Sequence, residues 1–172
     1  MTPTRIDGLQ VSVGGLSRAE LRSALAARGV LLNDHAETLL AARDFDNAAR
    51  VITVTETTVA TLGRPEGATL SEIFELARVQ GLTFCPVDTG PYLRLVLDKQ
   101  AASADSVLSA GKAPDGALSV ASKPLSDDVE YPKGFYLRVV DGQMWLRGYR
   151  CDEDHVFSPS DRFVFRASAP SA

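Results

Sequence analysis

Residues 134–149, GFYLRVVDGQMWLRGY, contain the clearest structural signal in the chain. Two runs of alternating apolar and polar residues flank the Asp141-Gly142 pair, and this combination is typical of a β-hairpin with a two-residue turn. Such a turn fixes the pairing across the two strands: Val140 with Gln143, Arg138 with Trp145, and Tyr136 with Arg147. We therefore expect an antiparallel hairpin here.

Because successive side chains of a strand point to opposite faces, the hairpin has two faces of different chemistry. The apolar face contains Phe135, Leu137, Val139, Met144 and Leu146. The opposite face, called here the Arg/aromatic face, contains Tyr136, Arg138, Trp145, Arg147 and Tyr149. Pairing across the strands is expected to bring its guanidinium groups within cation–π distance of its rings.

Two further stretches show the same alternation, YLRLVLD at 92–98 and RFVFR at 162–166. Both are predicted to be strands of the same sheet, with Arg94 and Arg162 on the Arg/aromatic face and the leucines and phenylalanines on the other face. The sequence thus predicts one set of binding residues: Arg94, Tyr136, Arg138, Trp145, Arg147, Tyr149 and Arg162.

The N-terminal part of the chain has helical signals. Ser17 and Glu20 have the spacing of a capping box, and a second helix is expected after Asn33, so residues 17–45 are predicted to form a helical hairpin. Further along, β-branched residues alternate at 50–60 and predict a strand. Thr69 opens a helix that ends at Gly81, and shorter strands are expected at 9–13 and 117–125.

These elements predict an α+β fold with a mixed, mostly antiparallel sheet of about five or six strands packed on one helix. The helical hairpin is expected to form an N-terminal appendage over residues 1–47, followed by the α+β domain over 48–166. Small and polar residues at 99–116 predict a mobile loop, and 167–172 are expected to form a disordered tail.

The composition limits the classes of function. The 18 basic and 22 acidic residues give a net charge of −4, which disfavours nucleic acid as a partner because no global positive field attracts it. The two cysteines are too few for a disulfide framework, and the N-terminal residues lack signal-peptide character. No apolar run approaches the roughly 20 residues of a membrane span, so we expect a cytoplasmic protein without membrane contact.

Three interpretations of the Arg/aromatic face remain open. It could be a solvated or helix-covered face, in which the arginines pack on rings and pair with acids. Alternatively, it binds a phosphate-bearing ligand, since guanidinium groups grip phosphate and rings stack on bases. The third interpretation is a protein-binding surface, because Trp, Tyr and Arg are enriched at binding hot spots.

The sequence contains little that indicates catalysis. It lacks the P-loop, GxSxG and HExxH motifs, and the CDEDH stretch at 151–155 has the character of a solvated turn rather than a metal site. We therefore expect no catalytic residue, metal or cofactor. The alternative is an enzyme of unknown class with a pocket near Cys85, Asp88 and His155.

Three segments resemble an uncharacterised bacterial domain family found mainly in Gram-positive organisms: CPVDTGPYLRL (85–95), GFYLRVVDGQMWLRGYR (134–150) and HVFSPSDRFVF (155–165). Members are sometimes labelled helicases, but this chain has none of the nucleotide-binding motifs of a helicase. The resemblance implies one coherent domain over about 50–166 and no particular substrate. The expected function is that of a non-enzymatic binding module for an unknown protein partner or an anionic ligand.

Overall fold

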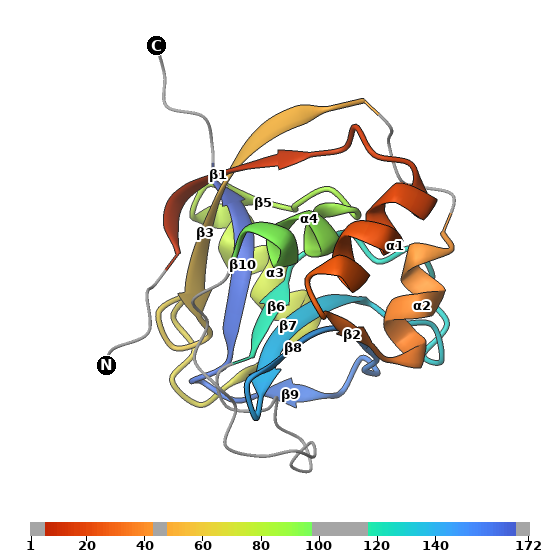
Figure 1. Ribbon diagram of the computed structural model, residues 1–172. Helices are drawn as coiled ribbons and strands as arrows, with labels where there is room; N and C mark the ends of the chain where they lie inside the picture. The colour runs from red at the N-terminus through yellow and green to blue at the C-terminus, as the bar shows by residue number, and fades with distance from the viewer. Residues whose placement is uncertain (1–5, 43–47, 98–116, 168–172) are drawn as a thin grey trace.

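The computed structural model describes residues 6–42, 48–97 and 117–167 (Figure 1), and the fold is α+β. Its helices are α1 (Arg18–Ala27), α2 (Asp34–Leu40), α3 (Leu70–Val79) and α4 (Thr89–Val96). Its strands are β1 (Asp7–Val13), β2 (Leu31–Leu32), β3 (Arg50–Thr58), β4 (Ala68–Thr69), β5 (Leu82–Thr83), β6 (Leu118–Val120), β7 (Gly134–Val140), β8 (Gln143–Tyr149), β9 (Val156–Phe157) and β10 (Arg162–Ala167).

The predicted hairpin is confirmed as β7 and β8. Its register pairs Val140 with Gln143, Arg138 with Trp145, and Tyr136 with Arg147. Asp141 and Gly142 both have positive φ, 50° and 77°, as a type I′ turn requires. This backbone twist matches that of the two strands, so the short-range sequence signal was sufficient to set the pairing.

The main sheet is mixed, with the strand order β1-β3-β10-β6-β7-β8-β2 and with β5 attached to β10. The β6–β10 and β2–β8 pairs are parallel, and the other pairs in this sheet are antiparallel. The described residues thus contain eight strands in this sheet, not the predicted five or six. The two-residue strands β2 and β5 were missed because two residues are too few to show an alternating pattern.

The strand predicted at 92–98 is wrong, because this segment lies mostly in helix α4. Short apolar runs fit either structure, and Pro91, whose ring suits the first turn of a helix, favours the helix. Gly90 lets this helix lie directly on β7, since a Cβ at Gly90 would come within 2.5 Å of the Phe135 Cβ.

The N-terminal helices form as predicted, but their connection is not that of a simple helical hairpin. The Ser17–Glu20 capping box starts α1, and the Asn33 side chain accepts a hydrogen bond from Ala36 at the start of α2. Between the two helices, β2 pairs with β8 at one end of the sheet. Asn33 extends this pairing, because its side chain bonds both the N–H and the C=O of Gly148.

Helices cover both faces of the sheet rather than one. Helices α1, α2 and α4 lie on one face, where their buried residues join those of β1, β3, β7 and β8 in a hydrophobic cluster called here the α4-side cluster (Figure 1). Helix α3 and strand β9 contribute to a second cluster, called here the α3-side cluster, with Phe163 and Phe165 of β10. Buried side chains from both sides of residue 47 therefore pack in the α4-side cluster.

The mobile loop expected at 99–116 and the tail from residue 168 onward lie outside the described residues. Residue 167, assigned to that tail, is the last residue of β10. Among the helices of the described ranges, none combines the length and apolar character needed to cross a membrane.

Candidate functional site

The Arg/aromatic face of the hairpin exists, and its central feature is the guanidinium group of Arg147. The Arg147 Cζ lies 5.0 Å from the centroid of the Trp145 ring and 5.9 Å from that of the Tyr136 ring. Both distances are within the range of a cation–π interaction. Strand pairing places all three residues on one face of the sheet, so the predicted contact between cations and rings is present.

Only part of this face reaches solvent. Arg138 is 0% exposed and Tyr136 is buried, whereas Trp145 and Arg147 are half-buried. Leu31 of β2 pairs with Trp145 and is 43% exposed. The accessible area, called here the Trp145–Arg147 surface, therefore consists of these two residues and Leu31.

Arg147 differs from the ion-paired arginines of this fold in how its charge is balanced. In the described part of the chain, no carboxylate lies within ion-pair distance of Arg147, and its buried Nε has no hydrogen-bond partner. Arg50, in contrast, lies 2.8 Å from an Asp88 oxygen. Burial raises the pKa of the Tyr136 hydroxyl, and the positive charges of Arg147 and Arg138 oppose this shift. Arg147 thus supplies a positive charge that no carboxylate of the described residues balances at ion-pair distance.

Arg94 does not belong to this face. It lies on α4 and is completely buried, and its guanidinium donates hydrogen bonds to the backbone carbonyls of Arg138 and Trp145, each at 3.5 Å. Burial, reinforced by the charge of Arg28, lowers the pKa of Arg94 to about 10, so the group remains protonated at neutral pH. Arg94 therefore attaches α4 to the hairpin, and its predicted place in a strand is wrong.

Arg162 lies on the opposite face from the one predicted. It pairs with Leu118, which in turn pairs with Leu137 of the apolar face, and its guanidinium lies 3.4 Å from a Glu56 oxygen. The neighbouring Phe163 is instead in line with Ser119 and Tyr136. The alternation within β10 was predicted correctly, but a shift of one residue in register exchanges the two faces.

Tyr149 is part of the packing rather than of the accessible surface. Its ring meets that of Phe157 edge-on at 6.4 Å, and its buried hydroxyl has no hydrogen-bond partner in the described part of the chain. Burial raises the pKa of this hydroxyl above its ordinary value. Tyr149 therefore supports the end of β8 against the α3-side cluster.

The three residues of the alternative enzyme pocket do not come together. Cys85 is 2% exposed in the α4-side cluster, and burial raises the pKa of its thiol to about 12. Asp88 is buried beside Arg50. His155 meets Phe157 of the α3-side cluster edge-on, with 4.6 Å between ring centroids. Across residues 6–42, 48–97 and 117–167, no three His, Cys, Asp or Glu side chains form a group that could hold a metal ion.

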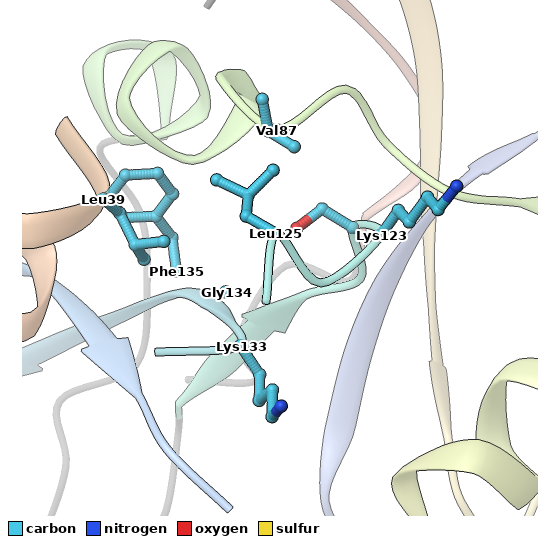
Figure 2. A pocket seen from close by; sticks show the side chains of 8 residues that line it. Leu39, Val87, Lys123, Leu125, Lys133, Gly134 and Phe135 are labelled. Carbon is cyan, nitrogen blue, oxygen red and sulfur yellow. The ribbon is translucent and has the colours of Figure 1, made fainter. Parts of the chain in front are cut away.

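Two hollows lie near the end of β7 where Gly134 stands. In the smaller one, Leu39, Val87, Leu125 and Phe135 surround an apolar space, while the ammonium groups of Lys123 and Lys133 point away from it (Figure 2). Its volume of about 10 Å³ is close to that of a single water site, so it is too small for a ligand.

The larger hollow, called here the α3 groove, has a volume of about 260 Å³. Residues from α3 and from two connections line it: Leu70, Ser71, Phe74, Pro124, Asp127, Val129, Lys133, Cys151, Asp152 and Glu153. Sequence reasoning missed the groove because both connections have the composition of ordinary solvated turns. The sequence carries no local signal that they face the same helix.

The hairpin therefore provides the candidate site that was predicted from sequence, reduced to the Trp145–Arg147 surface. Of the seven predicted binding residues, Tyr136 and Arg138 lie on the same face but are buried. Arg94, Tyr149 and Arg162 instead make internal contacts with other parts of the fold. In comparisons with known proteins, the chain matches no family model, no curated protein and no solved structure.

Proposed function

We propose that this chain is a non-enzymatic binding module and that the Trp145–Arg147 surface is its contact site. The observation that carries the proposal is the Arg147 guanidinium, which lies against two aromatic rings with no carboxylate paired to it in the described part of the chain. Tryptophan and arginine are the residue types most enriched at binding hot spots. The half-buried Trp145 and the exposed Leu31 supply apolar area beside the charge.

The chemistry of Arg147 favours an oxyanion as the group that is recognised. A guanidinium presents its donors as a planar fork that matches a carboxylate or a phosphate. The two rings restrict the Arg147 side chain before binding, so less conformational entropy is lost when the ligand arrives. A ligand does not have to displace an internal carboxylate of the described residues to reach this group.

The net charge of −4 favours a compact anionic group over an extended polyanion. A long nucleic acid would meet repulsion from the net negative charge of the chain beyond this positive group. A carboxylate or phosphate on a protein segment would approach that site locally, with apolar contacts to Trp145 and Leu31. The proposed partner is therefore a protein segment bearing an oxyanion, and the proposed location is the cytoplasm, where the two free cysteines stay reduced.

The experiment uses the fluorescence of Trp145, the only tryptophan in the chain. The protein is titrated with an acidic peptide, with a phosphorylated peptide and with a single-stranded oligonucleotide, each at low and at moderate salt. We expect one of the two peptides to change Trp145 emission saturably, and Arg147→Gln to weaken that binding about tenfold. Arg166→Gln removes the same charge at an exposed position on β10 and is expected to leave binding unchanged.

Comparison of the probes also tests the partner class. Tightest binding by the oligonucleotide, with a steep loss of affinity as salt rises, would mean that the surface recognises nucleic acid and would refute the proposed protein segment. Equal weakening by Arg147→Gln and Arg166→Gln would show non-specific attraction and would refute the site. Absence of any saturable change with all three probes would refute the proposed oxyanion recognition.

A further inference from the structure

The α3 groove is a second candidate binding site, separate in its lining residues from the Trp145–Arg147 surface. Its wall on the helix side is formed by the first two turns of α3, where Leu70 is buried and Phe74 is half-buried. The Phe74 ring is held edge-on against Phe84 at 4.8 Å and against Phe165 at 6.4 Å. These ring contacts make the wall a firm part of the α3-side cluster.

Apolar groups extend from this wall to the opposite side of the groove. Pro124 and Cys151 are half-buried, and Val129 is 48% exposed although it is a large apolar residue. Together they give the groove an apolar floor that remains in contact with water. Covering such a floor with an aliphatic chain would be favourable by the hydrophobic effect.

The charges around this floor are mainly negative. Asp127, Asp152 and Glu153 line the groove and are exposed, and within the described ranges no Lys, Arg or His side chain is ion-paired with them. Lys133 also lines the groove, but its ammonium donates a hydrogen bond to the Ser126 carbonyl at 3.0 Å. Three carboxylates against one ammonium leave the groove attractive to a cation.

Size and charge together point to one class of occupant. A volume of about 260 Å³ lies below the usual range of about 300–1,000 Å³ for small-molecule pockets. It suits a single long side chain, and lysine and arginine combine an aliphatic stem with a charged end. We propose that the α3 groove accepts a Lys or Arg side chain from a partner protein. Its aliphatic stem would lie against Phe74 and Val129, and its cation would lie among the three carboxylates.

The test measures binding of a synthetic peptide with sequence Gly-Leu-Arg-Leu-Gly, blocked at both ends, by NMR titration of the full chain at low salt. A peptide with glutamine in place of arginine is the matched probe. We expect amide shifts confined to the start of α3 and to residues 124–133 and 151–153, and binding at least about fivefold tighter than that of the glutamine peptide.

Two double variants separate the groove from general electrostatic attraction. Asp127→Asn with Glu153→Gln removes two exposed groove carboxylates that have no internal ion pair in the described part of the chain, and it is expected to weaken binding about fivefold. Asp34→Asn with Glu66→Gln removes the same charge at exposed positions outside the groove and is expected to leave binding unchanged. Equal weakening by both pairs, or shifts located elsewhere, would overturn the proposal.

Cys151 provides an independent readout because its thiol lies in the groove wall. An occupied groove should slow alkylation of Cys151 by iodoacetamide, while the buried Cys85 stays unreacted with or without peptide. An unchanged alkylation rate at saturating peptide would contradict the proposal. The Arg147→Gln variant is expected to bind this peptide normally, so failure of the groove and failure of the Trp145–Arg147 surface are distinguishable.

Discussion

Arginine side chains around β7 and β8 occupy different environments, and these environments decide their roles. Arg94 is buried and bonded to backbone carbonyls, whereas Arg162 lies beside Glu56 on the apolar face. Arg147 packs on two rings without a carboxylate partner in the described part of the chain. Arg94 therefore connects helix α4 to the hairpin, Arg162 balances the buried Glu56, and Arg147 forms a candidate contact site. Strand register and burial, rather than residue type, distinguish these roles.

The two cysteines give a test at the residue scale. We expect a thiol reagent at pH 8 to modify only Cys151 in the native protein, and Cys85 only after unfolding, because Cys85 is almost completely buried. Burial raises the pKa of both thiols, so neither behaves as an activated nucleophile. Fast modification of Cys85 below pH 7 would contradict this packing and would favour the enzyme alternative.

The raised pKa of Cys85 also predicts a pH dependence of stability. Below the ordinary thiol pKa, near 8.5, Cys85 is protonated in both the folded and the unfolded chain. Between that pH and about 12, the unfolded chain loses this proton while the folded chain keeps it, so the free energy of unfolding should fall as pH rises. Urea unfolding at pH 8 and pH 10 measures this loss, and Cys85→Ala should reduce it. An equal loss in that variant would contradict the assignment to Cys85.

At the scale of elements, the hairpin turn can be tested separately from packing. Gly142→Ala should destabilise the protein by about 1 kcal/mol, because Gly142 has φ of 77° while its surroundings are open. Gly142→Asn should cost less, since asparagine tolerates the left-handed region better than alanine does. Urea unfolding followed by circular dichroism measures both values. Equal stability of the alanine variant and the wild-type chain would contradict the type I′ turn.

Elements with strong local signals could be predicted, and those set by distant contacts could not. The Asp141-Gly142 turn and the Ser17 cap depend on neighbouring residues alone, so the hairpin and the start of α1 were predicted correctly. Helix α4 owes its place to packing of Gly90 on Phe135, 45 residues away. The face occupied by Arg162 depends on pairing with β6, which alternation within one strand does not reveal.

The candidate site, like the fold, could be predicted from the sequence only where local signals determine it. Its rings and Arg147 follow from the hairpin register, which the turn sets. The burial of Arg138 and the exposure of Leu31 depend on which segments cover the sheet. Leu31 enters the surface only because β2 pairs with β8, and a two-residue strand leaves no periodic signal. Local sequence thus predicted the chemistry of the face but not its accessible part.

At the scale of the whole molecule, the N-terminal helices and the sheet share the α4-side cluster. Leu25→Ala on α1 should therefore destabilise the entire fold by about 2–5 kcal/mol, with a single transition seen alike by circular dichroism and by Trp145 fluorescence. Ala26→Ser, at an exposed position of the same helix, should change stability by no more than about 0.5 kcal/mol. Loss of α1 in a separate, earlier transition would contradict a shared core.

The Arg147 guanidinium, which has no carboxylate partner in the described part of the chain, lies against the half-buried Trp145 ring, and collisional quenching of Trp145 tests this arrangement without a partner. At matched ionic strength, iodide should quench Trp145 more strongly than caesium, because Arg147 attracts anions to the ring. Arg147→Gln should remove most of this preference, and Arg166→Gln should preserve it. Equal quenching by the two ions in the wild-type chain, or a preference that survives Arg147→Gln, would contradict the account.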